Sequence, residues 1–335
     1  VPDCKPSLRR YPSSRMTHLL DFEKPALDLQ RRLEELREQP EENDVPLDIG
    51  DEIRQLEEKI EAKKRELYSN LSAWQRVQLA RHPQRPYSLD YINKTFSGFS
   101  ELHGDRLFHD DHAIVAGFAM LGERRVMVVG TQKGRDTKEN IKRNFGCAHP
   151  EGYRKALRIM GMANRFGLPI VCLIDTAGAY PGVAAEERHI AKAIAINLRE
   201  MTLFSVPMIS VVIGEGGSGG ALGIGVSDRT LILENAYYSV ISPEGCAAIL
   251  WKDRAAAPQA AEALKITAND LHELNLVDEV VPEPLGGAHN DHDTMANTLR
   301  DALLRNLNEL EQIDPEIRLQ ERYAKYRRHG KYIEG

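Results

Sequence analysis

The chain has 335 residues, 42% of them hydrophobic and 28% charged, which is the composition of an ordinary globular protein. Its net charge of −6 gives no basic excess, which argues against nucleic acid as the main partner. No stretch approaches the ~18 consecutive apolar residues of a transmembrane helix, so we expect no membrane span. The four cysteines are too far apart for a C-x-x-C metal site, and their scarcity favours a reducing compartment.

The N-terminal part of the chain predicts an extension followed by a helical arm. Residues 1–18 lack the apolar core of a secretory signal, and we expect them to be disordered. In residues 19–85, apolar residues recur every three or four positions on both sides of an acidic connector at 41–51. This pattern predicts a helical hairpin that lies on the following domain or on a partner subunit.

Metal-ligand residue types crowd the segment 103–112, which contains His103, Asp105, His109 and His112. Their spacing is not the i, i+4 pair of a helical metal site, and the glycine and repeated acids suit a polar turn. We therefore expect His103 and Arg106 to order a loop, and we predict no metal site in this chain.

From residue 86 to 287, strand and helix patterns alternate. Uninterrupted apolar strands separated by helices are typical of βαβ units, so the fold class is α/β. Residues 288–335 are charged and helical, with leucines on one face, and predict docking helices. The strands are expected at 113–121, 125–131, 170–174, 207–213, 230–233 and 237–241, and the helices at 153–166, 184–204 and 293–328.

The loop 175–182 follows a buried strand, at the edge of the sheet where open α/β folds place their ligands. A second glycine-rich segment follows the strand 207–213, so the two segments are expected to form opposite walls of one cleft. Asp175 is interpreted either as a turn carboxylate or as a residue of this site.

Seven glycines lie within residues 214–225, and three mechanisms fit them. The pattern G-x-G-x-x-G, with Glu234 downstream, fits dinucleotide binding. The pattern G-x-S-x-G fits a nucleophile at Ser218, with Asp278 and His289 or His292 as partners. The third mechanism uses no side chain: neighbouring backbone N–H groups form an oxyanion hole. Tight packing of a helix on the sheet is the structural alternative.

A basic run occupies residues 133–158, which contain eight basic and three acidic residues and so have a net charge of +5. Such a run fits the phosphates of coenzyme A or a nucleotide, or an acidic partner domain. A solvated helix face is the alternative.

Eight sequence blocks occur in order along the chain: HPQRP at 82–86, ELHGDR at 101–106, QKGR at 132–135, NFG at 144–146, PEGYRKA at 150–156, GAYPG at 178–182, GEGGSGGA at 214–221 and SPEGC at 242–246. Together they resemble one family, the alpha subunits of the acetyl-CoA carboxylase carboxyltransferase of bacteria and plastids. The resemblance covers residues 19–287.

The resemblance implies a crotonase-like superhelix of ββα units that works in an α2β2 assembly. The implied reaction moves a carboxyl group from carboxybiotin, borne on a biotin carboxyl carrier protein charged by a biotin carboxylase, to acetyl-CoA, giving malonyl-CoA for fatty-acid synthesis. Biotin is not attached to this chain, and zinc belongs to the beta subunit. The implied compartment is the bacterial cytoplasm or the plastid stroma.

The resemblance also implies which residues form the site. Backbone N–H groups would stabilise the oxyanion, and substrate would lie against the loop 178–183 and the basic run. The candidate catalytic residues are Gly216, Gly217, Gly219 and Gly220, and the candidate binding residues are Gly178, Tyr180, Gly182, Val183, Lys133, Arg135 and Arg154.

One departure from the family is Ala177, which replaces a loop proline and restores backbone freedom there. Two other functions stay open: a single-chain crotonase-type hydratase, isomerase or decarboxylase acting on an acyl-CoA, and a non-catalytic assembly subunit.

Overall fold

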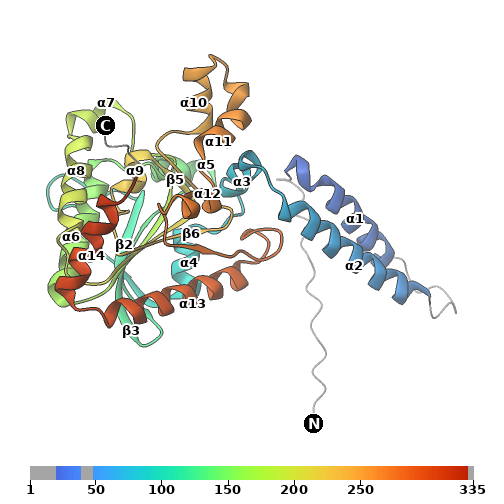
Figure 1. The fold of residues 1–335 in the computed structure, drawn as a ribbon, viewed down its shortest axis with the longest axis horizontal. Coiled ribbons are helices and arrows are strands. Elements are labelled where there is room, and N and C mark those ends of the chain that lie inside the picture. Colours follow the sequence, from blue (N-terminus) through green and yellow to red (C-terminus); the bar gives the residue numbers. More distant parts are fainter. Residues whose placement is uncertain (1–19, 39–47, 331–335) are drawn as a thin grey trace, which may run out of the picture. The chain divides into compact units, whose positions relative to one another are not determined.

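The computed structural model describes residues 20–38 and 48–330, and the chain divides into two compact units after Asn70. The extension expected at residues 1–18 lies outside the described residues. The smaller unit contains the helical hairpin, and the larger unit contains the sheet (Figure 1).

The smaller unit confirms the predicted hairpin. A 3₁₀ turn, Asp21–Glu23, leads into α1 (Lys24–Glu38), and α2 (Asp48–Ser69) packs against it. Their common core is small, with Leu33, Leu56 and Ile60 buried between the helices. Ion pairs on the exposed faces, such as Arg65 with Glu61 at 2.6 Å, join residues one turn apart and add little stability. The sequence grouped residues 71–85 with this arm, but α3 (Ala73–Ala80) packs in the larger unit, against β5 and α11.

In the described residues of the larger unit, eight strands form one sheet. The first three strands are antiparallel, and the strands from β3 onward are parallel. The order along the sheet is β1 (Ser97–Glu101), β2 (Ile114–Leu121), β3 (Arg124–Thr131), β4 (Ile170–Thr176), β5 (Met208–Gly217), β6 (Arg229–Leu233) and β8 (Glu279–Val281), with β7 (Tyr237–Ser239) beside β5.

The long strand β5 carries two neighbours on one edge. Its first part, Ile209 to Val212, pairs with β6, and its last part, Glu215 to Gly217, pairs with β7. The sheet therefore turns where β5 continues past β6, and the glycine-rich segment lies at this turn.

Helices cover both faces of the sheet (Figure 1). Gly152 of α6 (Pro150–Phe166) lies against Ile114, and Ser88 of α4 (Ser88–Thr95) lies against Gly130. Ile114 pairs with Thr131, the neighbour of Gly130, so these two contacts lie on opposite faces. Two-sided burial explains why β3, β4 and β5 are apolar almost throughout.

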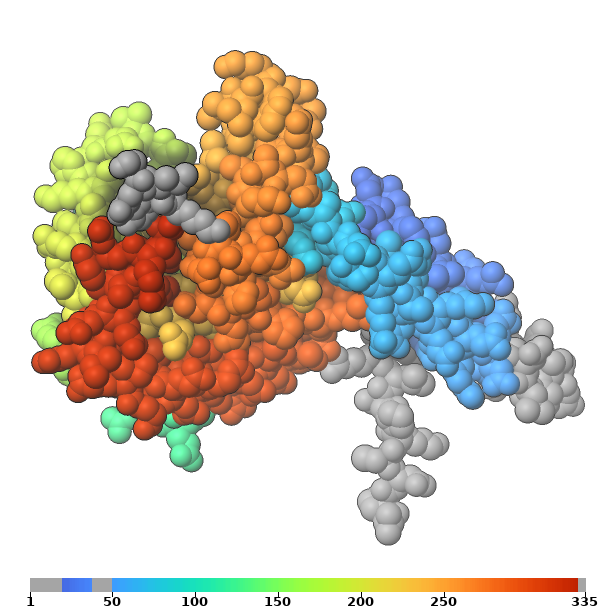
Figure 2. Space-filling view, viewed as in Figure 1, coloured from blue at the N-terminus to red at the C-terminus, as the bar shows by residue number. Residues whose placement is uncertain are grey.

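The remaining helices connect the strands or extend the core. α8 packs on α6, α13 packs on α4, and α10 and α11 protrude from the larger unit (Figures 1 and 2). They are α5 (Thr137–Lys142), α7 (Val183–Glu187), α8 (Ile190–Met201), α9 (Ser218–Leu222), α10 (Pro243–Leu250), α11 (Ala257–Leu264), α12 (Ala268–Glu273), α13 (His292–Glu311) and α14 (Pro315–Arg327), with 3₁₀ turns at Asn144–Gly146 and Arg254–Ala256.

Two expected helices are each divided in two. The helix predicted at 184–204 breaks at His189, whose φ of +63° places it in the left-handed region. The helix predicted at 293–328 breaks before Pro315, which begins α14. The second break has a sequence signal, because proline favours the first position of a helix. The first break has none, since histidine is tolerated inside helices.

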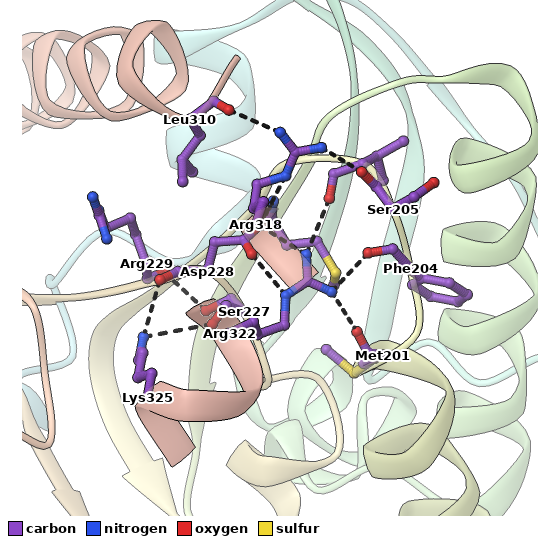
Figure 3. A network of polar contacts seen from close by, with 12 residues as sticks. Met201, Phe204, Ser205, Ser227, Asp228, Arg229, Leu310, Arg318, Arg322 and Lys325 are labelled. Carbon is purple, nitrogen blue, oxygen red and sulfur yellow. Dashed lines mark hydrogen bonds and ion pairs between the residues drawn. The ribbon is translucent and has the colours of Figure 1, made fainter. Parts of the chain in front are cut away.

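The C-terminal helix α14 is anchored through buried charge (Figure 3). Arg322 forms two bonds to the carboxylate of Asp228, at 2.7 and 2.8 Å, and donates to the carbonyls of Met201 and Phe204. Asp228 also accepts from the backbone N–H of Met208 at 2.7 Å. This network therefore joins α14 to the amino ends of β5 and β6.

Candidate functional site

The glycine-rich segment begins inside β5 rather than in a turn. The sequence placed the end of this strand at Ile213, but β5 continues to Gly217. Gly216 pairs with Thr176 of β4 on one side and with Tyr238 of β7 on the other. The chain leaves the strand only at Ser218, whose φ of +48° begins the short helix α9.

Three of the candidate glycines are required by close packing. A Cβ on Gly217 would lie 2.1 Å from the carbonyl oxygen of Ala177, and one on Gly220 would lie 2.3 Å from the carbonyl carbon of Gly178. A Cβ on Gly216 would lie 2.9 Å from the ring of Tyr238. The two loops therefore pack directly on each other, and the expectation that they form opposite walls of a cleft is wrong for these contacts.

Gly219 has different surroundings. A Cβ there would meet only the Cδ1 atom of Ile194, at the ordinary contact distance of 3.4 Å. Leu222, on the same short helix, and Val183, at the start of α7, are both exposed. The backbone of α9 is therefore partly accessible at Gly219, on the same short helix as the exposed side chain of Leu222.

The loop 178–183 is held by Tyr180. Its ring stacks on His149 at 4.0 Å, and its N–H donates to the carbonyl of Ala148 at 3.0 Å. Gly182 lies so close to this ring that a Cβ would be 2.3 Å from it. The GAYPG block thus places an aromatic ring between His149 and the backbone of Gly182.

Charged side chains meet at the carboxyl ends of β3, β4 and β5. The ammonium of Lys133 donates to Asp175 and to Glu215, each at 2.7 Å. Glu215 also accepts from Arg81 at 2.7 Å and from the hydroxyl of Tyr237 at 2.6 Å. Asp175 and Glu215 are buried. We call Arg81, Lys133, Asp175 and Glu215 the strand-end cluster.

Two members of the cluster, Lys133 and Glu215, are held in their charged forms. Burial favours the neutral form of Glu215, but Lys133 and Arg81 outweigh it and lower its pKa to about 2. Burial also opposes the charge of Lys133, yet Asp175 and Glu215 raise the pKa of its ammonium. Sequence analysis missed Arg81 and Glu215, although a lone acid between glycines in an apolar strand is a detectable signal.

Six of the eight basic residues in the run are bonded to other groups of the protein. Lys133 belongs to the strand-end cluster. Arg135 pairs with Asp90, donates to the carbonyl of Pro83 and lies 3.8 Å from the ring of Tyr87. Partners also hold Arg143, Arg154, Lys155 and Arg158, whose acceptors lie on Glu139, Asp105, Asp110 and the carbonyl of Gly104 respectively.

The pairing explains the excess of positive charge. The acids that pair with Lys133, Arg135, Arg154 and Lys155 lie outside the run in the sequence, on β4 and β5, on α4 and in the loop 103–112, so counting within the run could not find them. Lys133, Arg135 and Arg154 thus have structural partners, and their part in substrate binding stays a prediction.

The loop 103–112 is ordered by hydrogen bonds. His103 pairs with Asp110 at 3.0 Å, while Lys155 holds the same carboxylate at 2.6 Å. Asp105 accepts from the backbone N–H groups of Leu107 and Phe108. In residues 20–38 and 48–330, no group of three or more metal-ligand side chains is arranged around a common point.

The topology argues against dinucleotide binding. The strands follow their sequence order from β1 to β6, without the reversal that creates a dinucleotide crevice. Glu234, the acid expected at the ribose, bonds instead to the backbone N–H of Glu283 at 3.1 Å. The helix after the glycines has five residues, too few for the long helix of that motif.

A serine nucleophile also lacks its partners. Ser218 follows the carboxyl end of β5, whereas Asp278 contacts the N–H of Thr230 and lies at the amino ends of β6 and β8. The ring of His292 bonds to the carbonyl of Gln84, and that of His289 stacks on His82 at 4.0 Å. Asp278, His289 and His292 thus contact other groups of the protein, and they do not form a catalytic triad with Ser218.

Comparison with known proteins identifies the family. The model of the acetyl co-enzyme A carboxylase carboxyltransferase-like family matches residues 19–330. The chain belongs to this family.

Relatives share more than half of their residues with this chain. An acetyl-coenzyme A carboxylase carboxyl transferase subunit alpha from Geobacter metallireducens is 55% identical over 94% of this chain and 98% of its own length. The protein of the same name from Thermus thermophilus is 56% identical over 94% and 99%.

Solved structures confirm the crotonase-like fold. Transcarboxylase 12S matches with a TM-score of 0.55 at 20% identity, over 68% of this chain and 42% of its own. This chain thus spans less than half of that protein. A Pseudomonas malonate decarboxylase hetero-tetramer, in complex with coenzyme A, matches with a TM-score of 0.54 at 16% identity, over 65% of this chain and 90% of the matched one.

No described helix combines the length and apolar character needed to cross a bilayer.

Proposed function

We propose that this chain is the alpha subunit of an acetyl-CoA carboxylase carboxyltransferase and that, with a beta subunit, it transfers a carboxyl group from carboxybiotin to acetyl-CoA. The observation that carries this proposal is the identity of 55% with a subunit of that name, over nearly the whole of both chains. The packed glycines and the partly accessible backbone at Gly219 support it, because such a transfer needs N–H donors and no side-chain nucleophile.

We assign the donors to the backbone N–H groups of Gly219 and Gly220. Both lie in the first turn of α9, where N–H groups have no partner within the helix. Gly216 and Gly217 are less suited, since their backbones take part in strand pairing. The open side of Gly219 lets a planar group approach the helix without meeting a Cβ.

The donors act where charge develops during the reaction. Carboxybiotin, borne on a separate carrier protein, supplies the carboxyl group, and its ring oxygen gains negative charge as the group leaves. Fixed N–H donors stabilise that charge more in the transition state than in the ground state, which is what accelerates the step. The apolar surfaces of Val183 and Leu222 would exclude water from the bound ring.

The partner subunit supplies what this chain lacks. We propose an α2β2 assembly in which the beta subunit carries zinc and holds the thioester of acetyl-CoA. The biotin carboxyl carrier protein and biotin carboxylase complete the cycle, in a bacterial cytoplasm or plastid stroma.

A reconstitution assay tests the proposal. The chain is co-purified with a candidate beta subunit and assayed for malonyl-CoA formation from carboxybiotin and acetyl-CoA. We expect activity only when both subunits are present. Turnover of an acyl-CoA by this chain alone would favour the single-chain enzyme instead, and a reconstituted complex without carboxyl transfer would contradict the proposal.

A further inference from the structure

The strand-end cluster lies where the backbone of the candidate site begins. Lys133 comes two residues after β3, Asp175 lies at the end of β4, and Glu215 lies near the end of β5. Because β3, β4 and β5 are parallel, these three strands present their carboxyl ends at the same edge of the sheet. A single ammonium, that of Lys133, thus joins three consecutive strand ends.

The cluster holds backbone as well as side chains. Oδ1 of Asp175, which accepts from Lys133, also accepts from the backbone N–H of Glu215 at 2.9 Å. A Cβ on Gly214 would lie 2.6 Å from the same oxygen, so only glycine permits this approach. The carboxylate of Asp175 is therefore bonded directly to the main chain of β5, shortly before the strand ends and Ser218 begins α9.

The hydrogen bonds of the strand-end cluster also reach α10, one of the two protruding helices. Arg81 donates to Glu215 and, through its other nitrogens, to Glu244 of α10 and to the hydroxyl of Tyr237 in β7. Tyr237 in turn donates to Glu215 at 2.6 Å. Each hydrogen bond to the carboxylate of Glu215 thus comes from a residue of another element or its end. These bonds fix β5 against β3, β7 and α3.

We propose that the strand-end cluster is a positioning device for carboxyl transfer: Glu215 and its partners fix the backbone of residues 214–220, and with it the N–H groups of Gly219 and Gly220. This inference rests on the proposed function for its activity readout. The four side chains are positioning residues, because they act through the backbone rather than by touching a substrate.

Buried charge suits this task better than apolar packing does. Burying ionised groups costs free energy, and an apolar cluster of the same volume is often equally stable or more so. Charged hydrogen bonds, however, have defined lengths and directions, so a fully bonded network selects one arrangement of the strands. Donors in an oxyanion hole need this accuracy, since a displacement of ~1 Å can reduce the rate about 10²-fold.

The test is Glu215→Gln in the chain assembled with its beta subunit. Glutamine keeps one acceptor oxygen, but its amide nitrogen can only donate, as the ammonium of Lys133 and the guanidinium of Arg81 do, so one of their two bonds is lost while the side-chain shape is kept. We expect kcat to fall roughly 10- to 100-fold. The KM for either substrate should change by less than about threefold, because the binding surfaces are untouched.

Asp228→Asn is the matched control. Asp228 is also a buried carboxylate bonded to an arginine (Figure 3), but it lies at the amino end of β6, whereas Ser218 follows the carboxyl end of β5. We expect it to lower the melting temperature as Glu215→Gln does and to leave the kcat of the folded enzyme unchanged. An equal fall of kcat in both variants would mean general destabilisation and would overturn the inference.

Amide hydrogen exchange gives a readout that needs no substrate. In Glu215→Gln, the peptide covering 214–220 should exchange faster, while the first half of β5 keeps its protection. If the variant does not fold or assemble, Tyr237→Phe replaces it: it removes one hydroxyl that donates to Glu215, and kcat should fall about threefold to tenfold.

The outcomes separate this inference from the proposed function. If the wild-type complex makes no malonyl-CoA, the proposed function fails, and the exchange measurement alone decides whether the cluster fixes the segment. If the wild-type complex is active and Glu215→Gln or its substitute has a normal kcat, the positioning role is overturned, whatever the exchange rates, and the proposed function stands.

Discussion

At the scale of single residues, the glycines of the segment 214–225 differ in what surrounds the missing Cβ. Gly217 and Gly220 face backbone atoms of the loop 175–182, whereas Gly219 faces only the tip of Ile194. Backbone atoms cannot move aside as a flexible side chain can, so the same substitution should have different effects along one short stretch.

We expect Gly217→Ala to lower the free energy of unfolding by at least about 1–3 kcal/mol, the usual cost of overpacking, because its Cβ would overlap the carbonyl oxygen of Ala177. Gly219→Ala should be close to wild type in stability, since its Cβ has room. Urea denaturation of the two variants measures the difference. Equal destabilisation would show that the distances around Gly217 do not control packing.

Activity should follow a different order. In assembled protein, Gly219→Val should reduce kcat about 10²- to 10³-fold, because a branched side chain blocks approach to the N–H donors of α9. Ser218→Ala should retain most of its activity, since the proposed mechanism does not use the hydroxyl. Steady-state kinetics compare them. A dead Ser218→Ala beside an active Gly219→Val would contradict the oxyanion proposal and restore the nucleophile.

At the scale of elements, α14 is attached mainly by polar contacts. The arginines Arg318 and Arg322 of α14 are both buried, and together they donate to six backbone carbonyl groups besides the carboxylate of Asp228 (Figure 3). Carbonyls at the ends of helices and strands need donors, and a guanidinium supplies up to five N–H groups from one side chain. The helix thus completes the hydrogen bonding of loops that precede β5 and β6.

We expect Arg322→Met to lower the free energy of unfolding by about 3–5 kcal/mol, since it leaves the charge of Asp228 buried without its main partner. Combining it with Asp228→Asn should recover part of this loss, because the unpaired charge is removed as well. Urea unfolding of the single and double variants measures the coupling. Strictly additive losses would show that the two groups do not interact.

At the scale of the whole molecule, buried carboxylates make stability depend on pH. Burial opposes ionisation of Glu283, but Arg85 lowers its pKa from 4.5 to about 2, and the pKa of Glu215 is lowered to about 2 as well. A carboxyl group with a lowered pKa in the folded state stabilises the fold above its unfolded pKa. This contribution is lost as the pH falls toward the folded value, because the unfolded chain binds protons first.

We therefore expect the free energy of unfolding to decrease between about pH 4.5 and pH 2 as these two groups lose their contribution. Urea titrations at a series of pH values measure it. The difference in stability between wild type and Glu215→Gln should shrink over the same range, since protonation removes the charge that the variant lacks. A constant difference would mean that Glu215 is not ionised in the folded protein.

Much of the fold could be predicted because it depends on local pattern. The helical hairpin follows from apolar residues at helical spacing, and the central strands follow from apolar runs that two covered faces require. Two short strands escaped prediction: β1 and β8 have five residues or fewer, and their lengths are set by neighbours rather than by their own sequence. The extension of β5 to Gly217 escaped for the same reason, since glycines are poor strand formers and pair here only because β4 and β7 lie on both sides.

By itself, the sequence determined the α/β class, the family and the segments that form the candidate site, because ordered motifs and periodic apolar residues are properties of the chain alone. The tertiary structure alone decided the partners of each charge. Lys133, Arg135 and Arg154 formed a basic run in the sequence, but each meets an acid that lies 42 or more residues away. Ion pairs depend on distance in space, and only the folded chain brings Lys133, Asp175 and Glu215 to the ends of adjacent strands.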